Sequence, residues 1–319
     1  MKGVKYLKKI GTRKALSPLF STRFRKEHPM PKLGMNMLLW TADVDEEHFP
    51  LFEELKKTGF DGVEIPLLVK REPAHYAKLR QALGDNGLEC TTITVATADA
   101  NPVNPDIKVQ VAALDHLKWA IATSAVLGSK ILCGPYHSAH GIFPELPPTP
   151  EELAFLRLRS ASVLIQAALF AQRHGIVLAV EYLNRFECYL VNTADDLDAL
   201  VGILHHPNCR PMYDTFHAHI EERNVNRTLS PRAQGIAHVH VSENNRGVPG
   251  SGQVNWHWTF KALKDGGYDG WYTIEAFGHK LPSLAAATKI WRPLFTSEAE
   301  VCTKGFAFMR AMLREDRSH

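Results

Sequence analysis

Three carboxylates and one imidazole recur at intervals of roughly thirty residues in the second half of the chain: Glu181, Asp214, His240 and Glu275. Each stands at the downstream end of a short apolar, β-branched run, within AVEYLNRFE, MYDTFHAHIEE, HVHVSENNRG and YTIEAFG. In a chain of alternating strands and helices, this spacing places one side chain at the same edge of four successive strands. We therefore expect the four to bind one divalent metal ion.

The donor types favour particular ions. Three carboxylates and one imidazole form a hard, oxygen-rich set that suits Mn²⁺ best, with Co²⁺ and Mg²⁺ as alternatives. Zinc with an open coordination position stays a further alternative. A single acid would more simply be a helix cap or a surface ion pair. Glu181 and Glu275, however, lie within apolar strand sequence, where a carboxylate is costly unless it has a partner.

The pattern around these residues predicts the fold. Strand-like runs occupy residues 33–40, 59–67, 89–96, 130–135, 176–183, 209–214, 235–242 and 270–277. Helical patterns lie between them, at residues 46–58, 108–127, from Thr149 to Gly175, after Thr193 and at 298–313. Eight alternations indicate an α/β protein with a single (β/α)₈ TIM barrel, because an open doubly wound sheet rarely needs eight units. No GxGxxG motif, P-loop or GxSxG elbow interrupts this pattern.

Charge divides the 319 residues into two domains of unequal size. Residues 1–29 contain nine basic side chains and one acid, Glu27, so they carry +8 while the remaining residues carry −5. We interpret residues 1–29 as a disordered basic extension and residues 30–319 as the catalytic barrel. An organelle presequence or a nucleic-acid-binding arm are the alternatives for the extension. The net acidic barrel argues against a nucleic-acid partner.

Cysteine usage and hydropathy indicate the compartment. The five cysteines are scattered and lack the paired spacing of metal or redox motifs, so we interpret them as reduced thiols of a cytoplasmic protein. No apolar run approaches the roughly twenty residues that a membrane span requires, and we expect no membrane partner.

The motifs resemble those of the ketose 3-epimerases, the D-tagatose and D-psicose 3-epimerase group of the xylose-isomerase-like sugar isomerase/epimerase superfamily. The resemblance runs from about Lys32 to the C-terminus and rests on three segments, ExxNRFE, DTFH and HxH ahead of ExNR, here EYLNRFE, DTFH and HVHVSENNR. It implies that Glu181, Asp214, His240 and Glu275 bind the metal and that Glu181 and Glu275 are the catalytic acid/base pair. It further implies substrate contacts from Glu187, His217 and Arg246, and a homo-oligomer, either a dimer or a tetramer.

The chemistry of a ketose explains such a set. A divalent ion that chelates the oxygens on C2 and C3 stabilises the enediolate left when the C3 proton is removed. Inversion at C3 requires one carboxyl group on each side of the sugar, with opposite protonation states. Arg246 and His217 are suited to hold substrate oxygens. We therefore expect a metal-dependent isomerase that epimerises a free ketose at C3.

Two residues and several functions stay open. Glu64 is interpreted either as a substrate contact or as a group that orients a metal ligand, and His238 either as a further ligand or as a supporting histidine. The alternative functions are an aldose-ketose isomerase such as a hydroxypyruvate isomerase, an inosose-dehydratase-like lyase, a metal-dependent AP endonuclease and a non-enzymatic sugar-binding module. The preferred ketose, and whether it is phosphorylated, are not indicated by the sequence.

Overall fold

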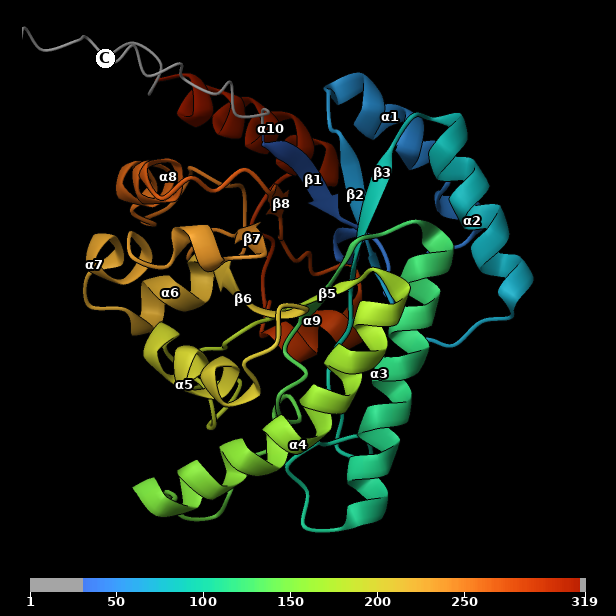
Figure 1. Cartoon of the computed structure of the whole chain (residues 1–319). Coiled ribbons are helices and arrows are strands. Elements are labelled where there is room, and N and C mark those ends of the chain that lie inside the picture. The colour runs from blue at the N-terminus through green and yellow to red at the C-terminus, as the bar shows by residue number, and fades with distance from the viewer. Residues whose placement is uncertain (1–30, 316–319) are drawn as a thin grey trace, which may run out of the picture.

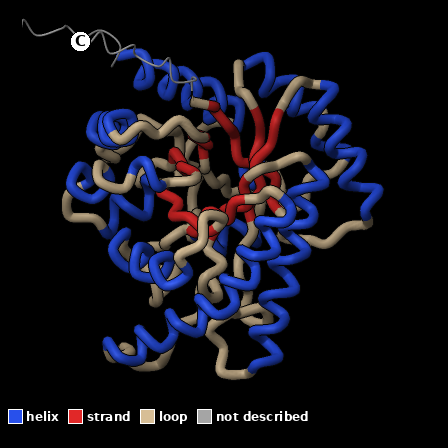
Figure 2. The backbone as a smooth tube through the Cα atoms, viewed as in Figure 1, coloured by secondary structure: helices blue, strands red, loops and turns tan. Residues whose placement is uncertain are grey.

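Eight parallel strands pair in sequence order and close into a barrel in the computed structural model, which describes residues 31–315. The strands gather at the centre and the helices surround them (Figures 1 and 2). The predicted (β/α)₈ barrel is therefore confirmed. The strands are β1 Lys32–Asn36, β2 Gly62–Pro66, β3 Glu89–Ile93, β4 Ile131–Gly134, β5 Val177–Val180, β6 Cys209–Asp214, β7 His238–Val241 and β8 Trp271–Ile274.

The ring of helices follows the start and stop signals of the sequence. A capping box between Thr149 and Glu152 opens the longest helix, and Gly175 ends it in a left-handed conformation, with φ 66°. Thr193 and Asp196 form a second capping box at the predicted place. The helices are α1 Pro50–Thr58, α2 Pro73–Asp85, α3 Ile107–Leu127, α4 Pro150–His174, α5 Ala194–Leu204, α6 Thr215–Glu221, α7 Val225–Leu229, α8 Trp256–Asp265, α9 Pro282–Thr288 and α10 Glu298–Glu315.

Most strands are shorter than the predicted runs, and two elements near the start of the barrel differ for a clear local reason. The first strand ends at Asn36 rather than at residue 40, because the Asn36 side chain accepts a hydrogen bond from the Leu38 amide and starts a 3₁₀ turn, Met37–Leu39. The helix predicted over residues 46–58 is divided into a 3₁₀ turn, Glu46–His48, and α1. The break falls before Pro50, whose missing amide hydrogen suits the first position of a helix.

Tight packing between neighbouring strands explains a glycine at the end of β4. Gly134 has φ 126°, a conformation that side chains rarely adopt, and a Cβ atom there would lie 2.1 Å from the carbonyl oxygen of Thr94. The chain can therefore turn out of β4 beside β3 only with glycine at this position.

Helix α4 corrects the expectation that no segment is long and apolar enough for a membrane span. Among the described residues, α4 alone has such a length and composition, with a mean hydropathy of 1.5 over its most apolar window. It packs against α3 and α5 in the outer ring of the barrel, and its buried residues are mostly alanine. Its apolar character is thus that of a helix covering a barrel.

The predicted basic extension, residues 1–29, lies outside the described residues.

Candidate active site

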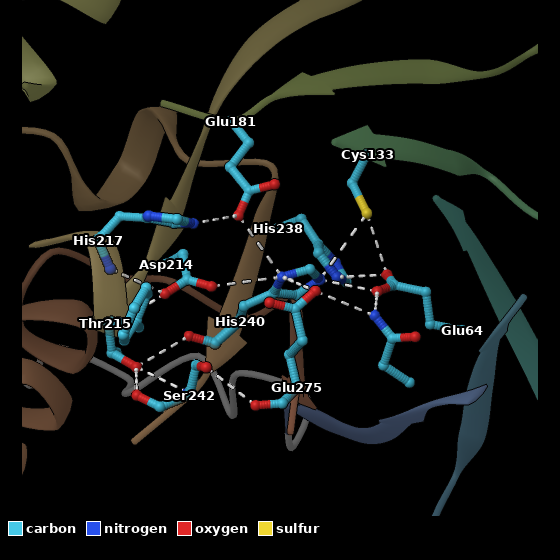
Figure 3. Close-up of polar contacts among 12 residues, drawn as sticks. Glu64, Cys133, Glu181, Asp214, Thr215, His217, His238, His240, Ser242 and Glu275 are labelled. Atoms are coloured by element: carbon cyan, nitrogen blue, oxygen red, sulfur yellow. Dashed lines mark hydrogen bonds and ion pairs between the residues drawn. The ribbon is translucent and has the colours of Figure 1, made fainter. Parts of the chain in front are cut away.

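The four predicted metal ligands meet at the carboxyl ends of four neighbouring strands. Glu181 directly follows β5, Asp214 ends β6, His240 lies in β7 and Glu275 directly follows β8. All four side chains are buried, and their ligand atoms lie within 4.8 Å of one another. The Nδ1 atom of His240 lies 3.7 Å from Oε1 of Glu181, and Figure 3 shows the carboxylates converging on this imidazole. The distances from Nδ1 are 3.6 Å to Oδ2 of Asp214 and 3.3 Å to Oε1 of Glu275.

Two polar atoms at the centre of this group lack hydrogen bonds. Neither Nδ1 of His240 nor Oε1 of Glu181 has a hydrogen-bond partner among the described residues, and both are buried. Buried polar atoms are almost always paired, so two such atoms facing one point are suited to share a cation. One nitrogen and three carboxylates fit a divalent ion such as Mn²⁺.

The electrostatics of the carboxylates support the same interpretation. Burial raises the pKa of Glu181 well above its ordinary value, and the negative charges of Glu275 and Asp214 raise it further. Burial also acts to raise the pKa of Asp214, but His217, His240 and Arg246 together hold it below its ordinary value. The Asp214 Oδ1 atom accepts from the amides of Phe216, at 2.5 Å, and of His217, at 3.2 Å, as the N-cap of α6. A divalent ion would relieve the mutual repulsion of these acids.

Glu64 orients the imidazole of His240. Its Oε1 atom lies 2.7 Å from Nε2 of His240, which leaves Nδ1 facing the carboxylates. Glu64 also accepts from Nδ2 of Asn36 and from Oγ1 of Thr91, each at 2.9 Å. Although burial acts to raise the pKa of Glu64, His240 and His238 hold it well below its ordinary value. Because Glu64 is fully buried beneath His240, its position fits the orienting role rather than a substrate contact.

His238 lies apart from the four-ligand group. Its Nε2 atom is 2.8 Å from Oε2 of Glu64, on the side away from Glu181 and Asp214 (Figure 3). Its place therefore fits a histidine that supports Glu64, and not a fifth ligand of the same ion.

Arg246 reaches into the site from the loop after β7. Its Nη1 atom donates to Oε2 of Glu275 at 2.5 Å, and its guanidinium lies 3.8 Å from the ring centre of Phe216 and 5.0 Å from that of Phe277. The backbone of Arg246 has φ 63°, an uncommon conformation for a residue with a side chain. Such strain is often found at functional positions, where the surrounding structure enforces it.

His217 and Glu187 share one anchor, Asn184. The Asn184 amide donates to Nδ1 of His217 at 3.0 Å, and Nε2 of the same ring lies 3.2 Å from Nη2 of Arg246 and 3.7 Å from Oε1 of Glu181. Burial lowers the pKa of His217, which keeps the ring neutral.

Nδ2 of Asn184 donates to Glu187 at 3.0 Å. Burial acts to raise the pKa of Glu187, but His140, His217 and Arg246 hold it at about 2. Both predicted substrate contacts thus border the four-ligand group.

Two buried residues were missed from the sequence. Asn36 contacts Glu64 and also donates to Oε1 of Glu275, at 3.3 Å; a polar residue inside the apolar run LGMNMLLW was the available signal. Glu243 accepts from the amides of Gly250, at 2.8 Å, and Val254, at 3.1 Å, and fixes the loop that carries Arg246. Its place two residues after β7 was the corresponding signal.

Comparison with known proteins agrees with this geometry. Residues 52–310 match the family model of the xylose isomerase-like TIM barrel. A ketose 3-epimerase of Arthrobacter globiformis is 31% identical over 288 residues, covering 88% of this chain and 96% of the relative. A D-psicose 3-epimerase of Agrobacterium fabrum is 29% identical, covering 82% and 91%. The crystal structure of a D-allulose 3-epimerase from Methylomonas sp. in complex with D-allulose superposes with a TM-score of 0.81 at 25% identity, covering 89% and 98%.

These matches extend over nearly the whole barrel, and each relative is covered almost from end to end. The chain belongs to the ketose 3-epimerases, which are isomerases within the xylose isomerase-like TIM barrel family.

Proposed function

We propose that the protein catalyses the metal-dependent epimerisation of a free ketose at C3, with Glu181 and Glu275 as the acid/base pair. The observation that carries this proposal is the position of the two carboxylates. They leave β5 and β8, strands separated by two others in the barrel, yet both face Nδ1 of His240. We expect carboxyl groups so placed to reach opposite sides of a substrate bound between them.

The proton transfers follow from the two carboxyl groups. One accepts the C3 proton while the other, in its protonated form, delivers a proton to the opposite face, which inverts the configuration. The two carboxyl groups have different surroundings: Glu275 accepts a hydrogen bond from Nη1 of Arg246, whereas Oε1 of Glu181 has no hydrogen-bond partner among the described residues. In the reverse reaction the two residues exchange roles.

The remaining polar groups would hold the substrate. Arg246 is positioned to donate to a substrate oxygen that gains negative charge, and His217 to form a hydrogen bond with O2. Glu187, ionised and anchored by Asn184, would accept a hydroxyl hydrogen bond. Their contacts with protein groups place all three before substrate arrives, so little reorganisation is needed.

Glu181, Asp214, His240 and Glu275 would bind the metal, which we propose to be Mn²⁺, with Co²⁺ and Mg²⁺ as alternatives. The bound ion supplies Lewis-acid polarisation of the substrate carbonyl. The oxygen-rich donor set and the two unpaired central atoms support this assignment.

Turnover in heavy water tests the reaction. Epimerisation at C3 places deuterium at C3 of a ketose product, which nuclear magnetic resonance detects. Label at C1 with an aldose product would identify an aldose-ketose isomerase instead, and loss of water would identify a lyase. A panel of free ketoses, their phosphates and hydroxypyruvate, each assayed with the metal-loaded protein, would define the preferred substrate.

We further propose that the protein is a cytoplasmic homo-oligomer, a dimer or a tetramer. Five buried free cysteines support a reducing compartment. Exposed apolar side chains at the start of α4 and in the preceding loop, including Leu146, Phe155 and Leu158, support contact with a second copy. Light scattering coupled to size-exclusion chromatography would give the mass in solution, and a monomeric mass would contradict the assembly.

A further inference from the structure

The interior of the barrel contains polar side chains where apolar ones are usual. Glu64 on β2, Cys133 on β4 and His238 on β7 are each 0% exposed. The interior of a TIM barrel is normally filled by valine, isoleucine and leucine. We call these three residues the inner cluster. Figure 3 shows Cys133 and Glu64 on the far side of His240 from Glu181 and Asp214.

The inner cluster presents three different donor atoms to one point. Oε2 of Glu64 lies 2.8 Å from Nε2 of His238 and 3.1 Å from Sγ of Cys133, and the ligand atoms lie within 4.8 Å of one another. The other oxygen of the same carboxylate, Oε1, holds Nε2 of His240. The two oxygens of Glu64 therefore face two different groups, and only Oε2 belongs to the inner cluster.

His238 is poorly satisfied in this environment. Its Nε2 atom is close to Glu64 but does not have the geometry of a hydrogen bond, and neither ring nitrogen has a hydrogen-bond partner among the described residues. An unpaired polar atom in a barrel core destabilises the fold, because it has lost its hydrogen bonds to water. A ligand that accepts the lone pair of Nε2 would remove this cost.

We propose that the inner cluster is a second metal site, which binds Zn²⁺ through Sγ of Cys133, Nε2 of His238 and Oε2 of Glu64. A sulfur, nitrogen and oxygen set of this kind suits zinc, and it contrasts with the sulfur-free set at the rim. Binding releases the thiol proton to solvent and leaves the His238 ring neutral. A thiolate, a carboxylate and Zn²⁺ then sum to zero charge, which suits a fully buried position.

The inner site would also affect the outer one. A metal ion on Oε2 fixes the carboxylate of Glu64, whose Oε1 atom holds His240. The inner ion would therefore position a ligand of the outer ion without contacting the substrate.

Cobalt substitution separates the two sites, because only the inner cluster offers a thiolate. The full chain would be produced in zinc-depleted, cobalt-supplemented medium, so that the buried site fills during folding. We expect two cobalt ions per chain by elemental analysis and a thiolate-to-cobalt charge-transfer band in the near ultraviolet. Cys133→Ser should contain one cobalt ion and lack the band. Asp214→Ala, altered only at the outer site, should also contain one ion but keep the band.

Cys302→Ser is the matched control, since Cys302 is also buried but lies on α10, outside the strands. This variant should retain both ions and the band. If Cys133→Ser does not fold, His238→Gln addresses the same site and should also lose one ion. A wild-type protein with one cobalt ion and no sulfur band would overturn the proposal, as would two ions in folded Cys133→Ser.

Discussion

Arg246 donates from Nη1 to Oε2 of Glu275 at 2.5 Å, and both side chains are almost completely buried. Phe216 and Phe277 restrict the guanidinium from the sides, so its direction toward the carboxylate is set by stacking as well as by charge. The guanidinium beside the proposed acid/base pair is rigid and planar, so a lysine at this position would not reproduce its contacts.

Replacing Arg246 with lysine should therefore lower kcat/KM although the charge is kept. Lysine loses the stacking and the forked donor geometry, and a charged hydrogen bond of this kind contributes about 1.5–3 kcal/mol, equivalent to roughly a ten- to hundredfold fall. Steady-state kinetics would measure it. Arg232→Lys is the control, because Arg232 pairs with Asp195 and Asp198 at α5, and its kinetics should match the wild type. Equal rates in both variants would refute the role of Arg246.

The paired carboxylates can be tested one at a time. Glu181→Gln and Glu275→Gln keep the shape and one oxygen ligand but remove the proton acceptor, so turnover should fall by at least about a hundredfold in each. Metal affinity, measured by calorimetry, should weaken less than in Asp214→Ala or His240→Ala, where a ligand is lost entirely. Near-normal turnover in both glutamine variants with metal bound would disprove the two-carboxylate mechanism.

Removal of the metal should abolish activity. After treatment with a chelator, Mn²⁺ or Co²⁺ should restore turnover better than Ca²⁺, whose longer bonds and higher coordination number need more ligands than the rim offers. The measurement is the initial rate against added ion, alongside the metal content of the stripped protein. Full activity in a preparation shown to be free of metal would exclude the proposed role of the four ligands.

Gly134 offers a test of the barrel itself. Gly134→Ala places a Cβ atom against the Thr94 carbonyl in a left-handed backbone conformation, so the free energy of unfolding should fall by at least about 2 kcal/mol. Gly202→Ala is the matched control: Gly202 lies in α5 with open space around it, and alanine there should be neutral or stabilising by up to about 1 kcal/mol. Urea titrations of both variants would give the two values, and equal values would contradict the steric explanation.

Deleting residues 1–29 should leave both folding and turnover intact. The first strand begins at Lys32, and its pairing with β2 and β8 uses residues of the barrel alone. The thermal midpoint and kcat of the shortened protein would be compared with those of the full chain. A large loss of thermal stability would show that the extension contributes to the fold.

The sequence predicted the rim of the site better than the interior. Glu181 and Glu275 were recognisable because a carboxylate within an apolar strand needs a partner, and the regular spacing fixed the edge on which they lie. The nitrogen of His240 that faces them was not predictable, because it depends on Glu64, 176 residues earlier in the chain. Cys133 was interpreted as one of several scattered thiols, since its neighbours come from β2 and β7 and leave no local spacing motif.

The closure of the barrel between its first and last strands has a consequence for how the protein is made. Asn36 donates to Glu275 across 239 positions of sequence, and β1 completes its pairing only when β8 is present. During synthesis the edge of β1 that pairs with β8 therefore stays unpaired until nearly the entire chain has left the ribosome. A product terminated before residue 271 lacks both β8, the strand that closes the barrel, and Glu275, a proposed acid/base residue, so it should be aggregation-prone as well as inactive.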